Sequence, residues 1–366
     1  MNWINHLRKK ISRFSHGMKF RQTMVFASIA WLSCATALAQ TPAQHQPGEV
    51  ELLRDPVLLH GVTQGFANTL PQEDRESCFA RWQAKGITKA KWEFWEISES
   101  QYFAHNPNTP EVLGPGHYHW ETADHAKQLT IRDGVVRMIY DTSKEWREGG
   151  RLNLPDKEGN RPKYDAVETS WPHFLIGQVF THEGNQSEAP EDDQKIIADG
   201  YVGLRFKADV RLNRLKKSSE WDHSSDFETA NHALFYIVFT VMPVASKSIS
   251  EPGKIYILVP AIYSEGDGHV KSSAPWIGFD QFGDSVYFTD SQPKLKAGEW
   301  VSYDFDMKKL IQEGLAAVEK EARAKGVKKS YRTEDYFLAK FIIGWEKWGG
   351  FDTDVEFKGL SLRGKR

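Results

Sequence analysis

The feature that most constrains the fold of this chain is a regular alternation of residue types between Tyr201 and Leu215. Apolar side chains occupy every second position from Leu204 to Leu212, and charged or polar side chains occupy the positions between them. Side chains of a β-strand point to opposite faces in turn, so this pattern predicts a strand with one buried face. The buried face needs a second layer of structure against it.

Other segments predict further strands, separated by turns. Residues 129–140 are typical of a hairpin with a turn at Asp133-Gly134. Residues 106–116 and 141–166, rich in proline and glycine, and the acidic residues 181–195 are expected to be loops. The remaining expected strands are 91–97, 171–180, 233–242, 254–262, 337–345, a hairpin over 275–290, and a last strand over 354–362 with a bulge at Gly359.

One helix is expected late in the chain. Asp306 is a suitable N-cap, Gly326 a suitable C-terminal stop, and an apolar stripe runs along Ile311, Leu315, Val318 and Ala322. The strands do not alternate with helices, which disfavours a parallel sheet. We therefore predict a mainly β fold: a two-sheet antiparallel β-sandwich, jelly-roll-like, with one helix inserted between late strands.

The N-terminus is typical of an export signal. Six basic residues and no acidic residue occur before residue 40, and an apolar run over about residues 24–38 ends in Ala37-Leu38-Ala39. The run is short for a membrane span, which needs about 20 residues. We expect a signal peptide over 1–39, a disordered lead-in over 40–50, and a single β-sandwich domain over 51–366. Residues 51–165 are expected to be its irregular part, with a helix over 74–84, a hairpin and long loops. The mature chain is expected to be secreted or periplasmic, without a transmembrane span.

Charge and cysteine content exclude some functions. The chain has 47 basic and 49 acidic residues, and removal of residues 1–39 leaves 41 against 49, a formal charge of −8. This balance disfavours nucleic acid as a partner, because nucleic-acid binding needs a basic footprint. Only Cys78 of the two cysteines remains after cleavage, so no internal disulfide can form.

Aromatic residues make up 13% of the chain, with 13 Trp, 12 Tyr and 21 Phe. Aromatic side chains favour strands and fill large sandwich cores. Their flat faces also suit stacking against sugar rings. Both roles are expected within the set.

The last third of the chain resembles a known group of domains. Gly298-Glu299-Trp300 precedes a strand and a helix, Ile343-Gly344-Trp345-Glu346 ends a later strand, and the final strand runs from Asp354 to Leu362. This order resembles galactose-binding-like and other jelly-roll carbohydrate-binding domains of secreted bacterial proteins over about residues 270–366. The resemblance implies a polysaccharide or oligosaccharide as the partner and assigns no catalytic residue.

The candidate sugar-binding residues combine indoles with polar groups. Trp345, Glu346 and Trp348 lie at the end of an expected strand, with Trp276 as a similar candidate. Trp171 and His173 open another strand, and Arg205 and Lys207 could hold an anionic polymer. Each has a structural alternative, since Trp345 is in line with Phe341 and Ile343 of a core and charged faces are commonly solvated.

Catalytic and metal sites are less well marked. A hydrolase needs two carboxylates flanking the bond, and Glu346 could pair with Glu93 or Glu96. A lyase needs a base, commonly His or Tyr, and a group that neutralises a uronate carboxylate. No cofactor is expected, since His117, His119, Asp124 and His125 match no zinc spacing. Asp352 and Asp354 could supply oxygens to a structural calcium.

Together these features favour an exported protein that binds a glycan through Trp and carboxylate residues. The alternatives are a polysaccharide lyase or glycoside hydrolase on the same sandwich fold, and an envelope structural or adhesive protein. Whether the chain is an enzyme stays open at this point.

Overall fold

The computed structural model describes residues 48–64, 72–97, 102–147, 173–180, 195–217, 232–246, 253–265, 276–279, 284–289, 295–326, 330–348 and 350–366. The chain divides into two compact units, Met1–Glu49 and Val50–Arg366, and the fold below is that of the second. The expected signal peptide lies outside the described residues, as do most of the loop over 141–166 and all of the loop over 181–195 except Lys195.

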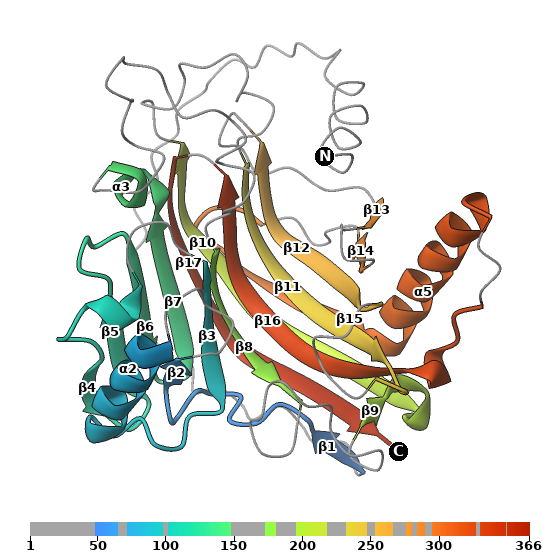
Figure 1. Ribbon diagram of the computed structural model, residues 1–366, viewed down its shortest axis with the longest axis horizontal. Coiled ribbons are helices and arrows are strands. Elements are labelled where there is room, and N and C mark those ends of the chain that lie inside the picture. Colours follow the sequence, from blue (N-terminus) through green and yellow to red (C-terminus); the bar gives the residue numbers. More distant parts are fainter. Residues whose placement is uncertain are drawn as a thin grey trace, which may run out of the picture. The chain divides into compact units, whose positions relative to one another are not determined.

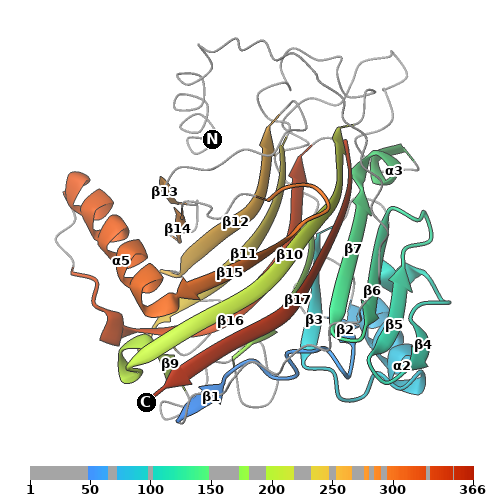
Figure 2. The same cartoon turned by 180° about the vertical axis from the view of Figure 1, so that it is seen from behind.

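Two β-sheets form the second unit (Figures 1 and 2). The described strands of the small sheet have the order β15-β10-β17-β7-β6-β5-β4, with β1 beside β17. Those of the large sheet have the order β13-β14-β12-β11-β16-β8-β3-β2, with β9 beside β16. The small sheet contains β1 (Glu49–Glu51), β4 (Glu111–Gly114), β5 (His117–Glu121), β6 (Lys127–Arg132), β7 (Val135–Asp141), β10 (Gly203–Lys217), β15 (Trp300–Asp306) and β17 (Phe351–Lys365). The large sheet contains β2 (Val62–Gln64), β3 (Trp92–Ile97), β8 (His173–Val179), β9 (Ile196–Ile197), β11 (His232–Pro243), β12 (Ile255–Glu265), β13 (Trp276–Phe279), β14 (Ser285–Phe288) and β16 (Tyr336–Trp348).

Most neighbouring strands are antiparallel, and the described exceptions are the pairs β12–β14 and β2–β3. Three helices accompany the described strands: α2 (Gln72–Ala84), α3 (Thr142–Arg147) and α5 (Met307–Ala324). The predicted fold class is confirmed, because two antiparallel-rich sheets pack as a sandwich and α5 lies between the late strands β15 and β16.

The predicted alternation of the strand after Tyr201 is confirmed in β10. Leu204, Phe206 and Val210 are at most 1% exposed, whereas Arg205 and Lys207 between them are exposed. The apolar face of β10 belongs to one core that also includes apolar residues of the large sheet. The expected bulge in the last strand is present as well, since the pairing of β17 with β10 shifts between Lys358 and Ser361 and Gly359 has φ +64°.

Many aromatic residues fill the space between the sheets. Trp82, Trp92, Trp120 and Trp345 are 0% exposed, and rings such as Phe235 and Trp345 pack edge to face with centroids 5.2 Å apart. Such contacts favour the observed packing. Part of the high aromatic content therefore serves the core.

Helix α5 closes one part of this core. Asp306 caps it by accepting a hydrogen bond from the Lys309 amide, as predicted. Ile311, Leu315 and Val318 of its expected apolar stripe are buried in the same core, and the helix contacts β10, β12 and β14. Ala322, the last residue of the stripe, is buried as well.

The expectation of an irregular region over 51–165 underestimated its regular structure. The loops expected over 106–116 and 141–166 contain β4 and α3, respectively. Residues 62–97 add β2 and β3 to the large sheet, and residues 111–141 add β4 to β7 to the small sheet. The strand expected over 91–97 and the hairpin expected over 129–140 are present as β3, β6 and β7. β2 and β4 were hard to predict because they have only three and four residues, too few to display a period.

Candidate functional site

Charged side chains on the outer face of the small sheet form a network of ion pairs. Arg205 bonds Asp304 on the neighbouring strand β15, and Lys207 lies 3.4 Å from the same carboxylate. Arg211 bonds Glu356 of β17. Arg205 and Lys207, predicted from the sequence to hold an anionic polymer, therefore already have a partner within the sheet, and both side chains are exposed.

The two carboxylates considered for calcium belong to the same network. Asp352 accepts a hydrogen bond from Arg214 at 2.7 Å, and Asp354 accepts one from Asn213 at 3.2 Å and binds Arg137 through both oxygens. Both carboxylates are therefore paired with arginine side chains of the same sheet. The described residues contain no group of three or more His, Cys, Asp or Glu side chains that could hold a metal ion.

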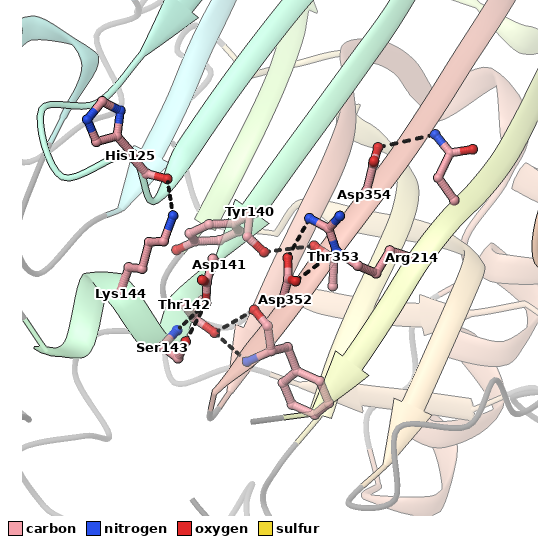
Figure 3. A network of polar contacts seen from close by, with 12 residues as sticks. His125, Tyr140, Asp141, Thr142, Ser143, Lys144, Arg214, Asp352, Thr353 and Asp354 are labelled. Carbon is pink, nitrogen blue, oxygen red and sulfur yellow. Dashed lines mark hydrogen bonds and ion pairs between the residues drawn. The ribbon is translucent and has the colours of Figure 1, made fainter. Parts of the chain in front are cut away.

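Figure 3 shows how this network continues to the start of α3. Thr142 accepts a hydrogen bond from the Phe351 amide at 2.8 Å, and the Thr353 hydroxyl donates to the Tyr140 carbonyl at 3.0 Å. Several of the contacts drawn are made by backbone groups at the junction of β7, α3 and β17. We interpret the network as structural support for that junction.

The outer face of the large sheet has a different character. It consists of side chains on the opposite side of the sheet from the core between the sheets. Six of its apolar and tyrosyl residues form a second buried cluster, in which each is 3–8% exposed: Leu175, Leu234, Tyr236, Val238, Leu258 and Ile342. Trp95 and Tyr256 pack against this cluster. The face therefore combines apolar and aromatic surface with a few ionisable groups, a composition typical of ligand sites.

Three side chains from three strands meet on this face. Glu346 on β16 lies opposite His173 on β8 and Leu234 on β11 in the sheet register. Its Oε2 atom is 3.2 Å from His173 Nε2 and accepts a hydrogen bond of 2.9 Å from the Tyr236 hydroxyl. Burial and the neighbouring Glu346 raise the pKa of Tyr236 well above its usual range, so the phenol keeps its proton.

With Glu346 ionised, the contact between the two side chains fixes the tautomer of His173. An ionised carboxylate only accepts hydrogen bonds, so His173 Nε2 carries the proton in the contact with Glu346. In the neutral ring the lone pair is then on Nδ1. This atom is buried and has no hydrogen-bond partner among the described residues. His173 thus combines an oriented ring with an uncommitted basic atom, as a general base does.

A second cluster lies further along the same face. Glu93 and Trp95 are on β3, and the Lys340 ammonium of β16 lies 4.4 Å from the centre of the Trp95 ring. Burial raises the pKa of Glu93 to about 8, against the opposing effects of Arg54 and Lys340. Burial and the nearby Lys254 lower the pKa of Lys340 to about 8. Perturbed groups of this kind gather at functional sites more than elsewhere.

The two clusters are separated along the sheet. Glu346 pairs with His173, whereas Glu93 pairs with Gly177 on the other side of the same strand. Four residues along the strand and two strand spacings put the Cα atoms of Glu93 and Glu346 about 17 Å apart. That separation does not suit the carboxyl spacing of about 5–5.5 Å in a retaining glycosidase.

The other residues predicted to bind a sugar or to act as carboxylates lie in different places. Trp345 is fully buried in the core, facing the opposite way from Glu346, and so is unavailable to a ligand. Trp348 ends β16 in register with His232, and Trp276 begins β13, but their side chains lie outside the described residues, as does Trp171 entirely. Glu96 has no described side chain either.

Sequence analysis missed Tyr236, Trp95 and Lys340 as members of a site. Tyr236 is within an apolar strand that indicated only burial, and Lys340 interrupts another such strand. A polar residue in an apolar strand is the signal that could have identified both, because burial without a partner is unfavourable.

Comparison with known proteins gives distant structural neighbours. No protein-family model and no curated protein matches the chain. An endoglucanase, Cel12A from Rhodothermus marinus, has a TM-score of 0.34 and 10% identity, covering 68% of this chain and 91% of that one. Endoglucanase 3 of Trichoderma harzianum, from family GH12, has a TM-score of 0.32 and 13% identity, covering 75% of this chain and 98% of that one. The family 11 xylanase of Neocallimastix patriciarum has a TM-score of 0.30 and 9% identity, covering 74% of this chain and 98% of that one. Similarities at this level identify neither a family nor a function for this chain.

Proposed function

We propose that this protein binds a polysaccharide across the outer face of the large sheet. The observation that carries the proposal is a set of buried polar atoms on that face without hydrogen-bond partners among the described residues: Glu93 Oε2, Trp95 Nε1, His173 Nδ1 and Thr240 Oγ1. An unsatisfied buried polar atom costs about 1–3 kcal/mol. A ligand rich in hydroxyl groups, which both donate and accept, would satisfy such atoms.

The side chains around these atoms suit a sugar. Trp95 and Tyr256 supply half-buried aromatic surface for the apolar side of a ring. Glu346 and His173, two of the residues predicted from the sequence, supply a charged acceptor and an imidazole on the same face. Trp348 and Trp276 remain part of the proposal as further stacking residues.

A specific observation favours cleavage by elimination as a second candidate function. His173 is oriented by Glu346, which is in turn held by Tyr236. In a uronate polymer, Nδ1 of His173 would take the proton from the carbon beside the carboxylate. The electrons would form a carbon–carbon double bond, the bond to the leaving sugar oxygen would break, and that oxygen would take a proton from water.

The rival readings have less support from the described residues. Retaining hydrolysis by Glu93 and Glu346 is disfavoured by their separation along the sheet. A purely structural or adhesive role gives no function to the contact of His173 with Glu346 beside the aromatic side chains of this face.

A glycan array followed by calorimetry tests the binding proposal. Wild type should bind at least one polysaccharide, and Trp348→Ala and His173→Ala should bind it more weakly, whereas Arg205→Ala should bind it as wild type does. Equal binding by all variants, with their folds intact, would place the ligand elsewhere. Binding of no glycan, together with release of no sugar or unsaturated product, would refute the carbohydrate reading.

Ultraviolet absorbance distinguishes elimination from binding alone. A lyase releases an unsaturated product that absorbs, and His173→Ala should abolish the signal while leaving some binding. If wild type binds a uronate polymer and produces no absorbing product, the protein is a binder and the elimination candidate is rejected.

We also propose that the chain is exported, as its first 39 residues indicate. The described residues contain no helix long and apolar enough to cross a membrane. Mass spectrometry of the protein isolated from the cell exterior or periplasm should find an N-terminus near residue 40, and an intact segment 1–39 would refute export with cleavage.

A further inference from the structure

Three ionisable side chains from separate parts of the chain surround one end of the outer face of the large sheet. They are Arg54, which precedes β2, Glu93 on β3 and Lys340 on β16. Arg54 donates a hydrogen bond to the Val179 carbonyl at 2.7 Å, and Lys340 pairs with Val179 in the sheet register. Glu93 pairs with Gly177, two residues away on the same strand. Trp95 lies among them, with Lys340 over its ring.

This group is not an ordinary structural ion pair. Elsewhere in the chain, buried carboxylates contact their cations directly: Asp284 lies 3.0 Å from Lys254, and Asp354 binds Arg137 through two hydrogen bonds. Glu93 has no such contact among the described residues, and its Oε2 atom is buried without a partner. Arg54 donates from Nη2 to the Val179 carbonyl at 2.7 Å. Buried charges are stabilised by direct contact, so this group is incomplete as it stands.

The local balance of charge is positive. Around Lys340 the facing charged groups are Glu93 from β3 and Lys254 from the start of β12, and Lys254 is already paired with Asp284. Around Glu93 they are Arg54 and Lys340. With its pKa near 8, the Glu93 carboxyl is mainly protonated at neutral pH, and two cations then face one neutral acid.

We propose that Lys340 and Arg54 form a subsite for the anionic substituent of an acidic sugar, so that the polysaccharide bound by this protein is anionic. This inference rests on the proposed function and adds the substrate class. The carboxylate of a uronic acid and a sulfate ester share the chemistry that such a subsite recognises.

Glu93 has a defined part in this subsite. When protonated, it can donate a hydrogen bond to the bound anion. When ionised, it neutralises one of the two cations and repels the ligand. Glu93 therefore makes anion binding depend on pH.

Calorimetry with three soluble polymers tests the proposal: polygalacturonate as the uronate, dextran sulfate as the sulfated arm, and a mixed-linkage β-glucan as the neutral arm. Wild type at pH 7 should bind one acidic polymer at least about tenfold more tightly than the neutral one, the gain expected of a charge-assisted contact. Whichever acidic polymer binds more tightly identifies carboxylate or sulfate as the recognised group.

Variants locate the effect. Lys340→Gln should weaken binding of the acidic polymer about tenfold or more and weaken binding of the neutral polymer much less. The matched control is Lys207→Gln, a lysine on the outer face of the small sheet that lies 3.4 Å from Asp304. It should bind both polymers as wild type does.

Glu93→Gln keeps the test decisive if Lys340→Gln fails to fold. Wild-type affinity for the acidic polymer should fall as the pH rises through about 8, since Glu93 gains a negative charge and Lys340 loses its positive one. Glu93→Gln should show a smaller fall. Three results would overturn the subsite: equal or tighter binding of the neutral polymer by wild type, unchanged acidic binding in a folded Lys340→Gln, or the same pH dependence in Glu93→Gln. If no polymer of any kind binds, the proposed function itself fails.

Discussion

Glu93 makes the stability of the fold depend on pH in an unusual direction. Most carboxyl groups of folded proteins are stabilised in the ionised form, but burial raises the pKa of Glu93 from its ordinary value of 4.5 to about 8. The folded chain therefore keeps a proton that the unfolded chain loses between these values. Stability from this group is fully present below pH 4.5 and is lost as the pH rises through about 8.

The magnitude follows from the size of the shift. Each pH unit between the two pKa values removes about 1.4 kcal/mol of unfolding free energy, so wild type should lose about 3 kcal/mol between pH 5 and pH 7 through Glu93 alone. The Glu93→Gln variant cannot titrate at this position. Its unfolding free energy, minus that of wild type, should therefore rise over the same interval.

Urea unfolding followed by tryptophan fluorescence at half-unit steps from pH 4.5 to pH 8 measures this difference. All other titrating groups are shared by the two proteins and cancel to first order. A Lys340→Gln comparison, measured from pH 8 to pH 10.5, supplies the opposite sign, because the pKa of Lys340 is lowered from 10.5 to about 8 and wild-type stability through this group rises between these values. A difference between wild type and Glu93→Gln that stays constant with pH would refute the reasoning.

Further predictions concern the sandwich and its helix. Leu204→Ala should lower the unfolding free energy by about 2–5 kcal/mol, since the side chain is 1% exposed in the core, whereas Lys207→Ala should change it by less than about 0.5 kcal/mol in the same urea assay. Comparable losses from the two would contradict the assignment of the faces of β10. Asp306→Ala removes the N-cap of α5 and should destabilise the protein by about 1 kcal/mol, whereas Asp306→Asn should retain most of the stability. If Asp306→Ala is as stable as wild type, the cap is unimportant.

Much of the sandwich could be predicted because its strands carry local signals. The alternation in β10, the Asp133-Gly134 turn between β6 and β7, and the bulge at Gly359 are all visible within a few residues of sequence. The cap and apolar stripe of α5 are local in the same way. Short strands such as β2 and β4 could not be predicted, since pairing with a neighbour, and not their own residues, makes them strands.

The candidate site depended on information that the sequence pattern does not contain. Tyr236 and Glu346 are 110 residues apart, and His173 and Glu346 are 173 apart, so only the register of β11, β16 and β8 brings them together. The alternation of side chains along β16 does predict which of its residues face the core. Trp345 follows the parity of Phe341 and Ile343, which places it in the core, and Glu346 must then face outwards.

The central claim, that a polysaccharide lies across the outer face of the large sheet, is tested most directly by one pair of variants. His173 and Arg205 are both sequence-predicted binding residues, both contact an acidic partner on a neighbouring strand, and they lie on the outer faces of different sheets. Calorimetric titration with the best-bound polysaccharide should show that His173→Ala loses about tenfold or more in affinity and that Arg205→Ala binds as wild type does. The opposite result, with affinity lost in Arg205→Ala and kept in His173→Ala, would contradict the account.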